Sequence, residues 1–151
     1  MDWAFDIAIK NRELLKSFIE NHTLEELNKV PEGFNNNIIW NIAHTIVTQQ
    51  LLVYKLSGLP TMVSEEMIGT YRKGTKTEGD LSQADVDTIK GLLFSTIEKT
   101  KEDYENKIFR TYSPYTVSTK STLSNADEAI DFNNFHEGIH LGYILALRKS
   151  I

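Results

Sequence analysis

The positions of the prolines constrain the fold of this chain most strongly, because a proline inside a helix removes a hydrogen bond and bends or breaks the helix. The sequence of 151 residues contains only three prolines, Pro31, Pro60 and Pro114. Apolar residues recur at spacings of three and four in four long segments, and each proline lies between two of these segments. The pattern predicts an all-α fold, a four-helix bundle, in a single domain over residues 1–151.

Local signals indicate where the predicted helices begin and end. Thr23 and Glu26 have the spacing of a capping box, so a short helical turn should run to about Lys29. Gly58 and Pro60 form a stop signal after the second long segment. We expect long helices over 2–20, 37–57, 82–105 and from 124 or 125 almost to the C-terminus.

Two connections between the long helices are too long for tight turns. The segment 59–80, between the second and third long helices, is rich in glycine and charge, and we expect it to form a lid or to wrap along the bundle. The segment 108–123, with alternating Thr, Val and Ser, could form a short extended hairpin, but it has too few apolar residues for a sheet, so we predict a loop.

The second predicted long helix is apolar on two faces. Ile42 and Ile46 lie on one face, and Val47 and Leu51 lie on the other. Such a helix is either central in the fold or covered by a partner, so we predict a homodimer. The narrow polar stripe that remains consists of Asn41, Thr45, Thr48 and Lys55.

Charge and composition exclude several classes of function. A net charge of −5 repels a phosphate backbone, and no face collects Lys and Arg, so we expect no nucleic-acid partner. The chain has no cysteine, and any metal ion must therefore be bound by imidazole, carboxylate or water. No basic and apolar leader opens the sequence, and 18 apolar residues never follow one another, so we expect a cytoplasmic protein without a membrane segment.

Three of the four histidines could converge on one metal ion. His136 and His140 are four residues apart on the last predicted helix, with Cβ atoms roughly 6 Å from each other. His44 lies in the middle of the second long helix, on an apolar face. Three imidazoles from two facing helices are the smallest ligand set that leaves an open position for water or substrate. His22, beside a helix cap, has no such companions and is interpreted as a surface residue.

The last helix also contains the pattern His-Glu-x-x-His, in which the glutamate of zinc proteases activates water. We reject a protease, because Tyr143 stands where the longer motif needs glycine and no further ligand helix follows His140. Glu137 is retained as the candidate catalytic base, with a solvated helix face as the alternative interpretation of its position.

These residues together resemble the DinB-like superfamily. Its members have a tryptophan four residues before a histidine on the second helix, here Trp40 and His44. They also have His-x-x-x-His-x-Gly near the C-terminus, here His136, His140 and Gly142. The resemblance extends over nearly the whole chain and implies a four-helix bundle whose three histidines bind zinc, nickel or a similar ion. It also implies frequent homodimers and activities that include thiol transfer, thiol-dependent isomerisation and hydrolysis.

The sequence therefore leads to two hypotheses of different class. In the first, the chain is a metalloenzyme that acts on a small-molecule substrate by thiol transfer or hydrolysis, with a low-molecular-weight thiol as possible cofactor and with Trp40 and Asn133 near the pocket. In the second, it is a non-catalytic metal-binding, interaction or stress-response bundle protein. A bundle without metal is a third alternative. Many family members have glutamine where Tyr143 stands here, so a substrate contact at that position is not carried over.

Overall fold

The computed structural model describes residues 1–151 and is mainly helical, which confirms the all-α prediction. The four longest helices occupy the four predicted long segments. None of the helices is long and apolar enough to cross a membrane. The elements are α1 (Asp2–Glu20), α2 (Leu24–Asn28), α3 (Ile38–Gln50), the π-helical turn η1 (Leu51–Lys55), α4 (Glu65–Tyr71), α5 (Gln83–Glu105), β1 (Tyr115–Thr116), β2 (Thr122–Leu123) and α6 (Ala126–Leu147).

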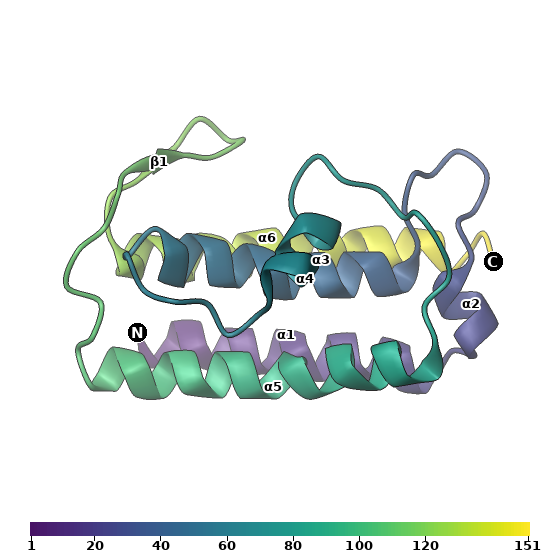
Figure 1. The fold of residues 1–151 in the computed structure, drawn as a ribbon, viewed down its shortest axis with the longest axis horizontal. Helices are drawn as coiled ribbons and strands as arrows, with labels where there is room; N and C mark the ends of the chain where they lie inside the picture. Colours follow the sequence, from purple (N-terminus) through teal and green to yellow (C-terminus); the bar gives the residue numbers. More distant parts are fainter.

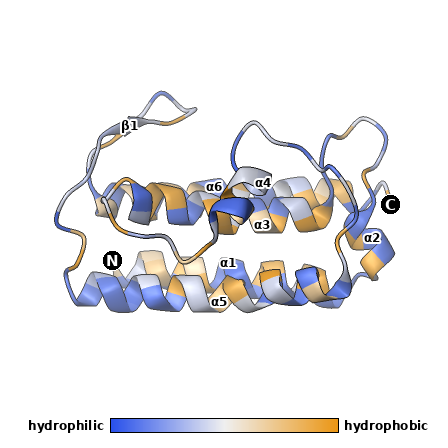
Figure 2. Ribbon diagram, viewed as in Figure 1, coloured by the Kyte–Doolittle hydropathy of each residue, from blue (hydrophilic) through white to orange (hydrophobic).

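The long helices lie side by side in two layers (Figure 1). In this view α3 and α6 form the upper layer and α1 and α5 the lower one, while α4 crosses the outer side of α3. Helix α1 packs against both α5 and α6, and α3 packs against both α5 and α6. Hydrophilic and hydrophobic residues alternate along α5 in Figure 2, as expected of a helix that buries one face and exposes the other. The core therefore runs the length of the molecule between the layers.

Side-chain caps begin the helices where the sequence indicates. Thr23 and Glu26 form a reciprocal capping box at α2, and Ser82 and Asp85 form another at α5. At α3 the side chain of Asn37 accepts a hydrogen bond from the backbone N–H of Trp40. Each cap pairs backbone donors that the first helical turn leaves without partners, which fixes the start of the helix.

Helix α3 is central, and its apolar faces are covered within the chain. Every residue of α3 except Thr48 is buried, and the helix packs against α4, α5 and α6. The first two residues of the predicted polar stripe are also buried, since Asn41 is 3% exposed and Thr45 is 0% exposed. The other helices of the chain already cover the two apolar faces of α3. These faces therefore give no reason to expect a homodimer through α3.

The α-helical hydrogen bonding of this segment ends seven residues earlier than predicted. From Leu51 the chain continues as the π-helical turn η1, in which the Leu56 N–H donates to the Leu51 carbonyl at 3.2 Å. A π-turn holds one residue more than an α-turn, and such turns occur frequently at functional sites. Here η1 forms part of the wall of a cavity, described below.

We predicted no helix in the first long connection and preferred a loop to a short hairpin in the second, but both connections contain short elements. The segment 59–80 does wrap along the bundle, but it contains α4, whose start is capped by Ser64. The predicted loop 108–123 contains β1 and β2, an antiparallel pair of two residues each. Thr116 and Thr122 share a hydrogen bond across this pair, and the buried side chains of Val117 and Leu123 anchor the hairpin on the core. These few contacts stabilise the short hairpin, although its strands lack the apolar pattern of a larger sheet.

Candidate metal centre

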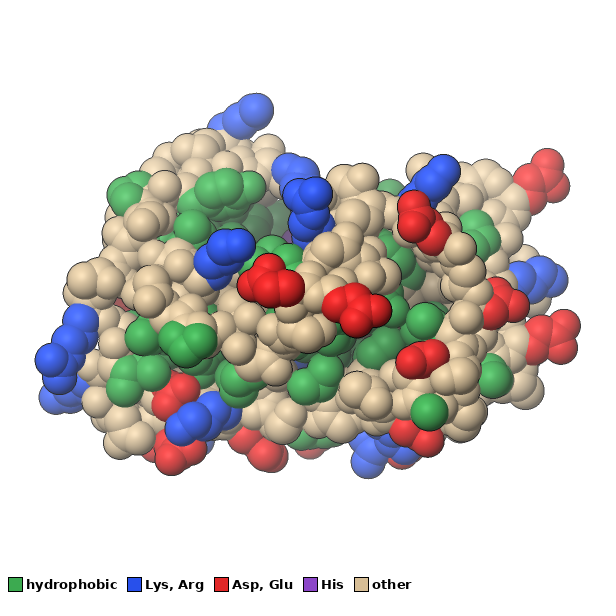
Figure 3. Space-filling view, in the orientation of Figure 1, with side chains coloured by type: hydrophobic (Ala, Val, Ile, Leu, Met, Phe, Trp, Pro, Cys, Tyr) green, Lys and Arg blue, Asp and Glu red, His purple; other side chains and the backbone are tan.

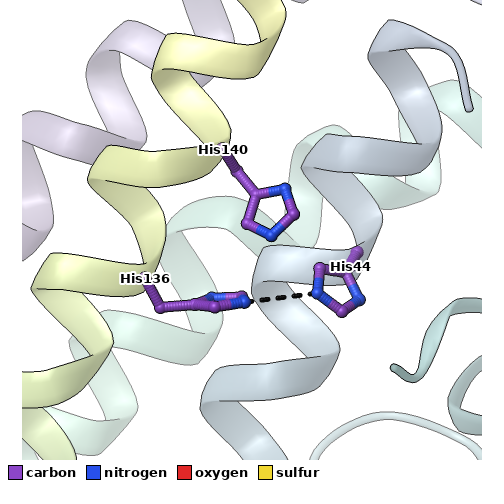
Figure 4. Close-up of side chains that lie close together, drawn as sticks. All are labelled: His44, His136 and His140. Carbon is purple, nitrogen blue, oxygen red and sulfur yellow. Dashed lines mark hydrogen bonds between the residues drawn. The ribbon is translucent and has the colours of Figure 1, made fainter. Parts of the chain in front are cut away.

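The three predicted histidines lie together between α3 and α6. His44 projects from the middle of α3, and His136 and His140 project from successive turns of α6 (Figure 4). One ligand atom from each of the three residues lies within 4.8 Å of the others. His44 Nε2 and His136 Nε2 are 3.2 Å apart. Helix packing therefore brings together residues that are 92 positions apart in the sequence.

Hydrogen bonds fix the orientation of two of the rings. His44 Nδ1 donates to the backbone carbonyl of Tyr71 at 2.6 Å, so its Nε2 faces the cluster. His140 Nδ1 donates to the side-chain oxygen of Asn41 at 2.8 Å. The amide of Asn41 is itself held by a hydrogen bond to the Asn37 carbonyl at 2.8 Å, which leaves its oxygen free to accept. An acceptor behind each ring is the arrangement that orients metal-binding histidines in proteins.

Burial keeps the imidazoles neutral. Burial is the main cause and the neighbouring histidines of the cluster add to it, and together they lower the pKa of His136 to about 3 and that of His140 to about 4. The pKa of His44 is also lowered by burial, although its hydrogen bond to the Tyr71 carbonyl opposes this effect. The neutral imidazole is the form that donates an electron pair to a metal ion, so all three rings are ready to bind one at neutral pH.

The residues of the cluster fit a divalent ion. A tetrahedral ion with Zn–N bonds of 2.0–2.1 Å keeps neighbouring nitrogens about 3.3 Å apart, close to the 3.2 Å between His44 and His136. Two bare nitrogen electron pairs at that distance repel each other unless a proton or a cation lies between them. His136 Nδ1 is buried without a hydrogen-bond partner, so no group of the chain fixes the tautomer of this ring. Three imidazoles and no thiolate form a donor set suited to zinc, nickel and similar ions.

Two cavities meet at the histidines. The first, which we call the polar chamber, has a volume of about 410 Å³ and is lined by Gly33, Phe34, Asn35, Asn36, Trp40, Asn41, His44, Lys73, Gly74, Thr75, His140, Tyr143 and Leu147. The second, the apolar chamber, has a volume of about 540 Å³ and is lined by His44, Thr48, Leu51, Leu52, Lys55, Leu56, Ile68, Arg72, Lys73, Tyr115, Val117, Ser118, Phe132, His136, Ile139 and His140. His44, His140 and Lys73 line both chambers, which places the cluster between them.

Trp40 lies beside the cluster. Its indole stacks on the ring of His44, with ring centres 4.7 Å apart and planes 9° apart. The residue also lines the polar chamber, and its buried Nε1 has no hydrogen-bond partner within the chain. Trp40 thus covers one face of a metal-binding candidate and offers an unpaired donor near the chamber.

Asn133 and Glu137 lie outside the histidine cluster and its two chambers. Both are buried on the face of α6 that packs against α1, and neither lines the polar or the apolar chamber. The Glu137 carboxylate pairs with the guanidinium of Arg12 at 2.6 Å and accepts a hydrogen bond from Asn133 at 3.1 Å. Glu137 is 0% exposed, which also excludes the alternative of a solvated helix face. His22 Nδ1 forms a hydrogen bond with the Phe18 carbonyl, and His22 is not part of the cluster.

Sequence reasoning missed the two residues that orient the histidines. We assigned Asn41 only to a narrow polar stripe, although a polar residue on a buried helix must find an internal partner. Tyr71 acts through its backbone carbonyl, to which the side-chain type gives no clue. The available signal was Ser64 followed by two glutamates, which is typical of a helix start and would have predicted α4.

The fold and the cluster together define an all-α protein with three histidines that could hold one metal ion. The sequence model of the DinB superfamily matches residues 8–144, and the chain belongs to that superfamily. A crystal structure described as that of a conserved protein from Enterococcus faecalis has a similar fold, with a TM-score of 0.68 and 12% identity. The match covers 99% of this chain and 95% of that one. No curated protein matches the sequence.

Proposed function

We propose that this chain is a metal-dependent enzyme that transfers a low-molecular-weight thiol to a small-molecule substrate. In this proposal His44, His136 and His140 bind one divalent ion, zinc or nickel. One observation carries it: His44 and His140 line two cavities of different chemistry. Two cavities at one site accommodate two reactants, as group transfer requires, whereas hydrolysis requires a cavity for only one reactant besides water.

The residues around the ion have distinct roles in this proposal. His44, His136 and His140 would hold the ion with one position open, and the bound ion would supply a lowered pKa for a thiol or a water molecule at that position. The carbonyl of Tyr71 and the amide of Asn41 hold two of the imidazoles in place. Trp40 shields one face of His44 from water. In the transfer, the thiol sulfur bonds to an electrophilic carbon, the leaving group departs with the bonding electron pair, and the thiol proton passes to solvent.

Metal content tests the first part of the proposal. Protein purified without a chelator or a histidine tag should contain about one divalent ion per chain by elemental analysis. Replacing His44, His136 or His140 by alanine should remove most of it, because each variant loses one of three ligands. His22→Ala is the matched control and should retain the ion. Equal metal content in all four variants would contradict the site.

Turnover tests the second part. The metal-loaded protein should speed the reaction of cysteine with chlorodinitrobenzene, and both chelation and His44→Ala should abolish the effect. Hydrolysis of nitrophenyl acetate without any thiol would instead favour the hydrolase version. If the loaded protein accelerates neither reaction, the alternative of a non-catalytic metal-binding or interaction protein is favoured.

We also propose a homodimer, now through α6 in place of α3. The outer face of α6 exposes four large apolar side chains, Phe135, Ile139, Tyr143 and Leu145, at 43–54% each. An exposed apolar face of this kind is typical of a protein interface. The same face borders both chambers through Ile139 and Tyr143, so a second copy would lie next to the site.

A further inference from the structure

The apolar chamber is built by segments from three parts of the chain. Its walls come from η1, from α4 and from the β hairpin together with α6. Leu52, Ile68 and Val117 are buried side chains that line it, and Phe132 and Ile139 lie opposite on α6. A volume of about 540 Å³ is within the range of small-molecule sites.

The charged residues of this chamber are all cationic. Lys55, Arg72 and Lys73 line it, while no Asp or Glu does. None of the three forms an ion pair with a carboxylate of the chain, although the chain as a whole carries a net charge of −5. The acidic residues Glu65 and Glu66 begin α4, whereas Arg72 follows its last residue. In Figure 3, blue Lys and Arg atoms lie around a hollow that is bordered by green hydrophobic atoms.

Unpaired cations beside apolar walls favour an anionic ligand. The apolar walls lower the local dielectric constant, so an anion in the chamber interacts with the cations more strongly than it would in open water. The apolar side chains favour a ligand that also has a hydrophobic body. A small hydrophilic anion satisfies only the first requirement, and a neutral apolar molecule satisfies only the second.

We propose that the apolar chamber binds an organic anion with a compact apolar body, such as an aromatic carboxylate. Lys55, Arg72 and Lys73 recognise its anionic group, and the residues of η1 and α6 enclose its body. As a statement about the substrate this rests on the proposed function, since the ligand would then be the electrophile presented to the histidines. As a statement about binding it does not require the metal ion.

Isothermal titration calorimetry with naphthoate tests the proposal on the full chain, both metal-loaded and metal-depleted. Naphthoate should bind both forms, and the neutral naphthamide and the small anion acetate should each bind at least about tenfold more weakly. The affinity for naphthoate should fall as salt is added. Equal affinity for naphthoate and naphthamide would overturn the proposal.

Charge-neutral variants locate the anionic group. Lys55→Gln, Arg72→Gln and Lys73→Gln should each weaken naphthoate binding by about threefold to tenfold, and Arg72→Gln with Lys73→Gln should weaken it further. Lys76→Gln is the matched control, because Lys76 lies in the connection between α4 and α5, like Arg72 and Lys73, but does not line the chamber. All these side chains are exposed, so the fold should persist, which circular dichroism checks.

Failure of this proposal can be distinguished from failure of the proposed function. If the three variants bind naphthoate as tightly as the wild type, or if only the metal-loaded form binds it, the chamber cations do not recognise the anion. Elemental analysis of the same samples reports separately on the histidine site. If the protein purifies without a metal ion and takes none up when one is added, but still binds naphthoate in the predicted order, the metalloenzyme is refuted and the anion site is supported.

Discussion

A buried ion pair between α1 and α6 offers a strong test of the packing. Arg12 and Glu137 are both 0% exposed, and the guanidinium contacts a single carboxylate oxygen through Nη2 at 2.6 Å and Nε at 2.8 Å. Arg12 also donates to the Leu93 carbonyl and, more weakly, to Thr96 on α5. Glu137→Leu would remove the carboxylate and leave the guanidinium in the core without a counterion.

Glu137→Leu should lower the free energy of unfolding strongly, and its effect should depend on whether Arg12 is present. Removing one partner of a buried ion pair costs about 3–5 kcal/mol, because the other charge stays buried without compensation. Replacing both partners with apolar residues, Arg12→Met with Glu137→Leu, should bring the free energy of unfolding back to within about 1 kcal/mol of the wild type. The double-mutant cycle should therefore give a coupling of about 3 kcal/mol or more.

Urea unfolding of the metal-depleted protein, followed by far-ultraviolet circular dichroism, measures these differences. Lys10→Met is the matched control, because it breaks the exposed Lys10–Asp6 pair and should cost less than about 1 kcal/mol. If Glu137→Leu costs no more than this control, or if the double variant is as unstable as the sum of the single ones, the reasoning is refuted. A folded double variant that keeps its metal but loses turnover would restore Glu137 as a catalytic residue.

Four other outcomes follow from the structure. Asn41→Leu removes the acceptor behind His140 and should weaken metal binding by about tenfold to a hundredfold in competition with a chelating dye. The metal-free protein should lose stability as the pH falls from about 6.5 to about 4, by up to about 1.4 kcal/mol per pH unit for each imidazole, because the low pKa values of His136 and His140 in the folded chain let the unfolded chain bind more protons. A flat profile of stability against pH in urea unfolding would contradict this. Sedimentation should show a dimer that Phe135→Ser with Ile139→Ser converts to a monomer. Chelation should leave the helical circular dichroism signal intact, since both apolar core clusters are built without the ion.

The long helices could be predicted because their signals are local. A cap such as Ser82 with Asp85 acts within one turn, and apolar spacing reports the buried face without knowledge of the partner. Local signals failed where tertiary contacts decide the conformation. The change to a π-turn at Leu51 and the two short strands have no counterpart in the apolar pattern.

The histidine cluster was predictable for a similar reason, and its surroundings were not. Spacings of four place Trp40 with His44 and His136 with His140 on common faces, so packing of the two helices was enough to join them. Glu137 follows His136 directly and is therefore turned about 100° around the helix, toward α1. The sequence motif contains the spacing but not the direction in which the next helix lies.

The π-turn after α3 separates the position of His44, which precedes it, from the wall of the apolar chamber, to which its last residues contribute. A π-turn is equivalent to one residue inserted into an α-helix, so deleting Leu52 would restore regular helix and rotate the residues that follow by about 100°. Lys55 and Leu56 would then leave the wall of the apolar chamber, while His44, which precedes the turn, would keep its place on α3. A single deletion at this point would therefore alter the wall of the chamber in which we propose anion binding and leave the three histidines in place.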